Sequence, residues 1–133
     1  MIKWPITYTD YNGEERTEDF YFNLNKAEVM EMNISHNGAF KEYLERMVEQ
    51  RDGAKMAETF RDIILKSYGE KTADGKRFVK SKELSEAFQQ TEAYSELYMQ
   101  LLTDETAAPK FIEGVMPKVE GAGAPVPAEL KLV

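Results

Sequence analysis

Two runs of alternating apolar and polar residues open the chain, and a short turn separates them. The apolar members are Trp4, Ile6, Tyr8, Phe20 and Phe22. Because successive side chains on a strand point to opposite faces, each apolar row occupies one face of its strand. The pattern predicts strands at about 3–9 and 15–23, joined as a β-hairpin.

The turn between these strands decides whether the two apolar rows share a face. A two-residue turn at Asn12-Gly13 would pair position 4 with position 21, and the rows would then face opposite sides. A three-residue loop over 11–13 instead pairs Trp4 with Phe20, which places both rows on one face. We therefore expect a type I turn that starts at Asp10, with Gly13 in the left-handed conformation. An isolated hairpin is marginally stable, so its apolar face should pack on helices.

The following residues show helical periodicity. Asn25 and Glu28 have the spacing of a capping box, and the break at Ser35-His36-Asn37-Gly38 ends that first helix. Apolar residues then recur at i, i+3, i+4 and i+7, which predicts further helices at about 39–51, 54–68 and 104–115. Ser81 and Thr91 are helix caps, and they begin either two helices or one bent helix.

Two further segments are predicted to be a loop and a tail. Gly69 is expected to stop the third helix, and 70–80 to form a polar loop with a turn at Asp74-Gly75 and an anchor at Phe78-Val79. Past Pro117 the chain is rich in Gly, Ala and Pro, so 118–133 is predicted to be a flexible tail. The fold class is α+β and predominantly helical: an N-terminal hairpin packed on about five short helices, in one domain over 1–117.

Composition narrows the classes of partner. The chain has 133 residues and 42% hydrophobic residues, which suffices for one core. Its net charge of −7 argues against nucleic acid and anionic membrane surfaces, and favours a basic or apolar partner. The absence of cysteine excludes disulfides and thiolate metal sites. The sequence contains no apolar run of membrane-spanning length and no signal peptide, so we expect a cytosolic location.

The sequence offers only weak candidates for a catalytic or metal-binding site. The lone histidine, His36, lies in a turn without a second metal ligand or a nucleophile. The segment that starts at Asp10 lacks the ligand spacing of a calcium loop. Four acidic residues at helical spacing are best interpreted as a solvated helix face: Glu42, Glu45, Glu49 and Asp52. We therefore expect a protein that is not an enzyme and has no catalytic, metal or cofactor site.

The run Phe20-Tyr-Phe-Asn-Leu-Asn-Lys-Ala-Glu-Val-Met-Glu-Met resembles a motif of the tail assembly chaperones of long-tailed bacteriophages and prophages. That motif is a short hairpin, then Phe, Leu, Ser or Asn, any residue, Ala and Glu, then a helix. Four later runs, at 62–71, 74–81, 85–97 and 110–117, are similar as well. The resemblance covers 3–117, is specific as an ordered set and is weak for any single run.

The resemblance implies both a fold and a role. It implies a small, mostly helical protein with an N-terminal hairpin, which binds the long tape-measure protein during tail assembly. Such proteins keep the tape-measure protein soluble in the cytoplasm of the bacterial host and are absent from the mature virion. In many phages a ribosomal frameshift gives a longer product that recruits tail-tube protein. Self-association into arcs or rings would assist the role and is a hypothesis.

An apolar surface is the expected means of binding, and Met is suited to surfaces that repack against varied segments. The candidate partner-binding residues are Met47, Met56, Phe60, Tyr94 and Tyr98. An apolar stripe at helical spacing is more often core than binding surface. Two other functions stay open at this stage: a structural tail or virion subunit, and a small phage-encoded regulatory protein that binds a host protein.

Overall fold

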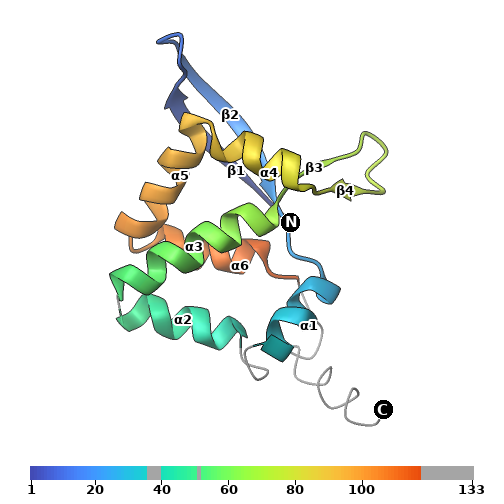
Figure 1. Cartoon of the computed structure of the whole chain (residues 1–133), viewed down its shortest axis with the longest axis vertical. Coiled ribbons are helices and arrows are strands. Elements are labelled where there is room, and N and C mark those ends of the chain that lie inside the picture. Colours follow the sequence, from blue (N-terminus) through green and yellow to red (C-terminus); the bar gives the residue numbers. More distant parts are fainter. Residues whose placement is uncertain (36–39, 51, 118–133) are drawn as a thin grey trace.

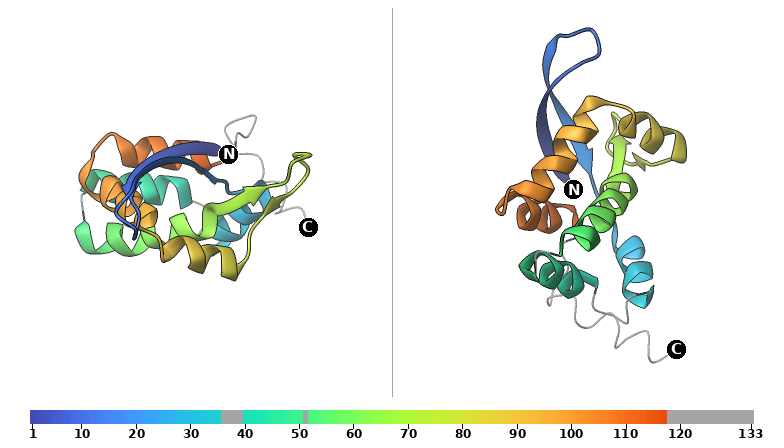
Figure 2. Two further views of the ribbon diagram at one scale, coloured as in Figure 1. Left: turned by 90° about the horizontal axis from the view of Figure 1, so that it is seen from above. Right: turned by 60° about the vertical axis from the view of Figure 1, so that its left-hand side comes forward.

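Helices pack against a small antiparallel sheet in the part of the chain that the computed structural model describes, which is 1–35, 40–50 and 52–117 (Figures 1 and 2). The strands run in the order β1-β2-β3-β4. The elements are β1 (Ile2–Thr9), β2 (Glu15–Phe22), α1 (Lys26–Ser35), α2 (Phe40–Gln50), α3 (Gly53–Ser67), β3 (Tyr68–Lys71), β4 (Phe78–Val79), α4 (Lys82–Gln89), α5 (Glu92–Thr103) and α6 (Ala107–Val115). The predicted class, α+β and mostly helical, is confirmed.

The N-terminal hairpin has the predicted register. Trp4 pairs with Phe20, and Ile2 pairs with Phe22. At the turn the Gly13 N–H donates to the Asp10 carbonyl at 3.0 Å, and Gly13 has a φ of 82°. The apolar face packs on α5 and α6, while the turn projects beyond the helices (Figure 1).

The predicted helix caps are present. The Asn25 side chain accepts the Glu28 N–H at 2.8 Å, and Glu28 accepts the Asn25 N–H at 2.9 Å, which completes a capping box. Ser81 and Thr91 cap α4 and α5 through their hydroxyl oxygens. Gln90 ends α4, so 82–103 forms two helices and not one bent helix.

The segment after α3 differs from the prediction. Gly69 does not stop the helix, because α3 ends when Tyr68 adopts an extended conformation, and Gly69 then lies in β3. The predicted loop over 70–80 contains β4, which pairs with β3 to form a second hairpin. A Cβ on Gly69 would lie 2.7 Å from the Val79 carbonyl oxygen, so glycine allows this close strand pairing.

Phe88 joins the two hairpins in the core. Its ring is 2% exposed, stacks on Tyr68 at 4.3 Å, and contacts Phe20 and Phe22 of β2 at centroid distances of 5.2 and 5.8 Å. Phe111 of α6 also packs on Phe22, with ring centroids 5.2 Å apart. Aromatic packing therefore connects both hairpins to α4 and α6.

The remaining predictions have mixed outcomes. The last helix begins at Ala107 and not near Asp104, because Asp104 forms a turn whose carboxylate accepts the N–H of Thr106 at 2.9 Å. The predicted turn at His36 and the predicted tail over 118–133 lie outside the described residues.

Candidate functional site

The sequence-predicted binding residues do not form one surface. Met47, Met56 and Phe60 are 3%, 8% and 1% exposed, so they belong to the core. Tyr94 and Tyr98 are half-buried on α5, where their rings stack at 5.8 Å, and burial raises the pKa of the Tyr94 phenol. The partner-binding role of these five residues stays a prediction.

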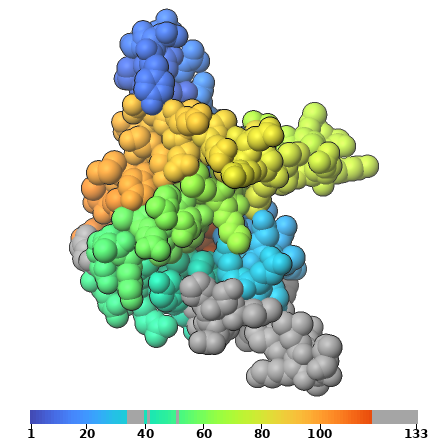
Figure 3. All heavy atoms as spheres, in the orientation of Figure 1, coloured from blue at the N-terminus to red at the C-terminus, as the bar shows by residue number. Residues whose placement is uncertain are grey.

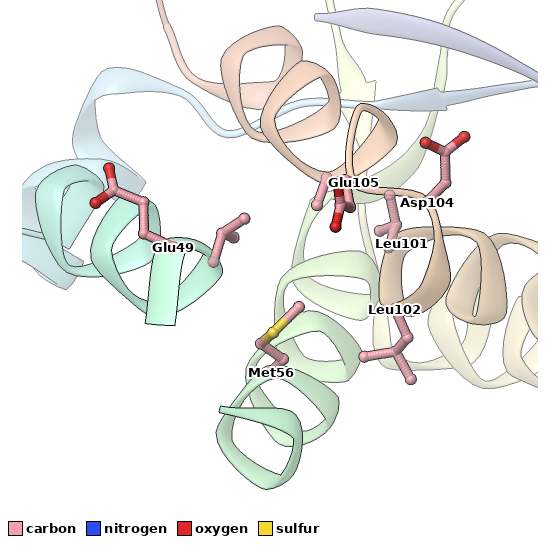
Figure 4. A pocket seen from close by; sticks show the side chains of 8 residues that line it. Glu49, Met56, Leu101, Leu102, Asp104 and Glu105 are labelled. Carbon is pink, nitrogen blue, oxygen red and sulfur yellow. The ribbon is translucent and has the colours of Figure 1, made fainter. Parts of the chain in front are cut away.

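Met56 nevertheless lines a small hollow of about 170 Å³ among α2, α3, α5 and α6 (Figure 4). Apolar side chains form its walls, and three carboxylates stand around it. Its lining residues are Val48, Glu49, Met56, Leu101, Leu102, Asp104, Glu105 and Ala108. The Asp104 carboxylate also accepts the hydroxyl of Thr106 at 2.7 Å, which helps to lower its pKa. That carboxylate therefore organises the start of α6.

A larger hollow of about 360 Å³ lies among α1, α2 and α3. These three helices lie together in the space-filling view, where α3 stands above α2 and α1 is beside them (Figure 3). The lining residues are Glu31, Met32, Phe40, Tyr43, Glu58, Thr59, Asp62, Ile63 and Lys66. We call this hollow the α1–α3 groove.

Local sequence explains the two chemical zones of the α1–α3 groove. Phe40 and Tyr43 belong to the apolar stripe of α2, and Ile63 belongs to the inner face of α3. Glu58 and Asp62 are one helical turn apart on α3, so their side chains project from the same face. Buried apolar residues thus form the floor, and exposed carboxylates form the rim.

The rim of the α1–α3 groove is acidic. Three carboxylates line it, from Glu31, Glu58 and Asp62, against the single ammonium of Lys66. Asp62 also forms an ion pair with Arg61 at 3.4 Å, and both side chains are about half exposed or more. Exposed pairs of this kind contribute little, so a partner's cation can compete for Asp62.

Acid–base and metal chemistry find no support in the described residues. No group of three or more His, Asp or Glu there has an arrangement that could hold a metal ion. The Asp10 carboxylate accepts the N–H groups of Asn12 and Glu14 and the Arg16 guanidinium, and the Arg16 bond is the largest cause of its lowered pKa. This carboxylate organises the hairpin turn, as predicted.

The acidic residues that the sequence places on one helix face are exposed where the structure describes them. Glu42, Glu45 and Glu49 lie on the solvent side of α2, and Asp52 caps α3 by accepting the Lys55 N–H at 3.2 Å.

None of the described helices is long and apolar enough to cross a bilayer.

Sequence reasoning did not identify the α1–α3 groove. Helical periodicity places Phe40, Tyr43 and Ile63 on apolar helix faces, but it cannot show where such a face remains partly uncovered. The spacing of Glu58 and Asp62 was the available signal, since two acids at i and i+4 lie next to an apolar face on α3.

Comparison with known proteins gives one family. The sequence model of the family described as phage tail assembly chaperone matches 1–119, which is most of the chain. A search of curated proteins and a search of solved structures each give no significant match. The matched range, 1–119, includes the range 3–117 that carries the resemblance. The chain therefore belongs to the phage tail assembly chaperone family.

Proposed function

We propose that this chaperone binds the tape-measure protein in the cytoplasm of the bacterial host and keeps it soluble until the tail tube assembles around it. The chaperone then leaves, so it is absent from the finished virion. Its action is binding alone, without a catalytic step, a metal or a cofactor.

The observation that carries the binding step is an open hollow with an apolar floor in a member of this family. Met32, Phe40 and Ile63 lie in that floor, where they are 8%, 5% and 3% exposed, and the half-buried ring of Tyr43 contributes its more exposed apolar surface. A long client with apolar helical stripes aggregates when those stripes meet one another. A chaperone that covers each stripe with its own apolar surface prevents that association.

Many weak contacts suffice for such a role. Several chaperone copies on one client act together, so modest affinity at each site gives stable coverage. Weak individual contacts also allow the chaperones to be displaced as the tube grows. A longer frameshift product that contacts tail-tube protein, and self-association of the bound copies, would extend this arrangement.

The direct test is co-expression with the tape-measure protein from the same tail gene cluster. We expect the tape-measure protein to remain in the soluble fraction and to co-purify with the chaperone. We also expect mass spectrometry of purified particles to lack this chain. A tape-measure protein that is equally insoluble with and without the chaperone would contradict the proposal.

The same experiment separates the two other functions. A structural tail subunit would be present in purified particles at a stoichiometric level. A regulator would co-purify with a host protein and would leave the solubility of the tape-measure protein unchanged. Either result would replace the proposed function.

A further inference from the structure

The α1–α3 groove combines an apolar floor with a rim of one predominant charge. Its described lining contains three acidic residues, Glu31, Glu58 and Asp62, and one basic residue, Lys66, while Arg61 beside it pairs with Asp62 at 3.4 Å. The whole chain has the same sign, with 24 acidic and 17 basic residues. A ligand that offers apolar side chains together with positive charge would match both features of this groove.

We propose that the α1–α3 groove receives an amphipathic helix of the client whose apolar stripe is flanked by lysine or arginine. This inference rests on the proposed function and assigns it a site and a ligand chemistry. The stripe packs on Phe40, Tyr43 and Ile63, in the manner of a helix laid in a groove. The flanking cations meet the carboxylates of Glu58 and Asp62 on the rim.

The charge of the groove favours a basic client helix over two other occupants, a second copy of the chain and the segment 118–133. A second copy of the chain would bring its own net charge of −7 to an acidic rim. The segment 118–133 has two lysines and two glutamates, so its net charge gives no attraction. A basic helix supplies both required properties, apolar anchors and positive charge.

Two matched synthetic helices provide the probe. Each has about 20 residues, or about 30 Å of helix, and a leucine stripe at i, i+3, i+4 and i+7. One carries lysine at the remaining positions, and the other carries glutamate. We expect the lysine helix to bind the full chain at least about tenfold more tightly than the glutamate helix, because only the lysine helix matches the rim.

Nuclear magnetic resonance then locates the binding. We expect the lysine helix to shift the amide signals of Glu31, Tyr43 and Thr59 most strongly. Shifts concentrated on α4 and α5 would overturn the assignment, since they would report general attraction to an acidic surface.

Charge reversal tests the rim itself. The double substitution Glu58→Lys/Asp62→Lys changes two exposed positions, and we expect it to weaken the lysine helix by about tenfold or more and to strengthen the glutamate helix. The matched control, Glu86→Lys/Glu96→Lys, reverses two exposed charges on α4 and α5 and should leave both affinities within about twofold. If the reversed variant does not fold, Glu58→Gln/Asp62→Asn should still weaken the lysine helix.

Other occupants would give distinct results. Sedimentation in which Glu58→Lys/Asp62→Lys dissociates a dimer would assign the groove to a second copy and overturn the proposal. Nuclear Overhauser contacts from 118–133 to Tyr43 in the peptide-free chain would assign it to that segment, with the same consequence.

The groove and the proposed function can fail separately. If the unaltered chaperone keeps the tape-measure protein soluble and Glu58→Lys/Asp62→Lys does so equally well, the groove assignment is wrong and the function stands. If the lysine helix binds as expected but the tape-measure protein stays insoluble, the proposed function is wrong and the groove has another basic client.

Discussion

The two hairpins of this protein differ in what holds them in place. The β1–β2 hairpin has eight paired positions and a turn whose backbone hydrogen bonds are local, with one long-range bond from the Tyr11 hydroxyl to the Gln90 carbonyl at 3.4 Å. The β3–β4 hairpin has two paired positions and attaches to the end of β2 by two more. Long alternating strands specify their own register, whereas a short hairpin depends on its neighbours. The first hairpin is therefore readable from sequence, and the second is a product of tertiary packing.

Removal of the ring that both hairpins share should have the largest effect. Phe88→Ala deletes a ring packed on Phe20, Phe22 and Tyr68, and we expect a loss of about 3–5 kcal/mol in the free energy of unfolding. Chemical denaturation followed by circular dichroism measures it. Tyr11→Ala, which removes a ring that is 76% exposed at the first turn, should change stability by less than about 0.5 kcal/mol. Equal losses in the two variants would contradict the proposed role of Phe88.

A substitution at Gly69 should have a smaller effect on stability, and this effect should be concentrated in the second hairpin. A methyl group at Gly69 would lie 2.7 Å from both Phe78 Cε2 and the Val79 carbonyl oxygen, so Gly69→Ala should cost about 1–3 kcal/mol. Hydrogen exchange should accelerate in β3 and β4 and much less in the centre of β1. Gly53→Ala, where a Cβ meets open space at the start of α3, should be neutral or stabilising by up to about 1 kcal/mol. Unchanged protection in β3 would show that the strands tolerate the methyl group.

Removal of the contact between the second hairpin and α1 should lower the free energy of unfolding by less than Gly69→Ala does. The Lys80 ammonium donates to the Asn23 carbonyl at 2.6 Å and to both Glu28 carboxylate oxygens, at 2.7 and 2.8 Å. Because the pair remains partly solvated, we expect Lys80→Met to cost about 1 kcal/mol or less. Exchange at the first turn of α1 should accelerate. Lys82→Met removes a looser, exposed pair with Glu86 and should leave α1 unchanged.

The smallest expected effect is a different response to salt of the aspartates in the two hairpin turns, Asp10 and Asp74. A hydrogen bond from Arg16 is the largest cause of the lowered pKa of Asp10, whereas a hydrogen bond from the Thr72 hydroxyl is the largest cause of the lowered pKa of Asp74. Salt screens charge, so high ionic strength should raise the pKa of Asp10 toward its ordinary value and move that of Asp74 less. Carboxyl-carbon resonances followed through a pH titration report both.

The sign of the pH dependence follows from these lowered values. A carboxyl group with a lower pKa in the folded state stabilises the fold above its unfolded pKa, and this contribution is lost as the pH falls through the folded value. Acidification should therefore loosen both turns before the core. A turn whose amide signals remain constant through the titration of its aspartate would contradict this expectation.

Several predictions succeeded because their causes are local. The capping box of Asn25 and Glu28 and the caps at Ser81 and Thr91 need only residues three positions apart. The class of fold follows from such signals together with hydrophobic periodicity. The order of the short motifs also indicated the family, and the family match agrees with it.

The candidate site was less predictable. Periodicity identified the apolar faces that contain Met47, Phe60 and Tyr43, but it did not separate the buried members from those at an opening. In the structure Met47 and Phe60 are enclosed, whereas Tyr43 lines the α1–α3 groove. The difference depends on how α1 packs beside α2 and α3, which no local pattern records.

The sequence by itself determined the register of the first hairpin, the starts of the three helices that Asn25, Ser81 and Thr91 cap, and the acidic charge, since each depends on residues close together in the chain or on composition alone. Tertiary structure alone decided that Gly69 belongs to a strand, that Phe88 joins two hairpins, and that an acidic-rimmed groove opens among α1, α2 and α3. These features depend on contacts between residues far apart in the chain, because space in a packed interior is shared by elements whose separate patterns do not specify their neighbours.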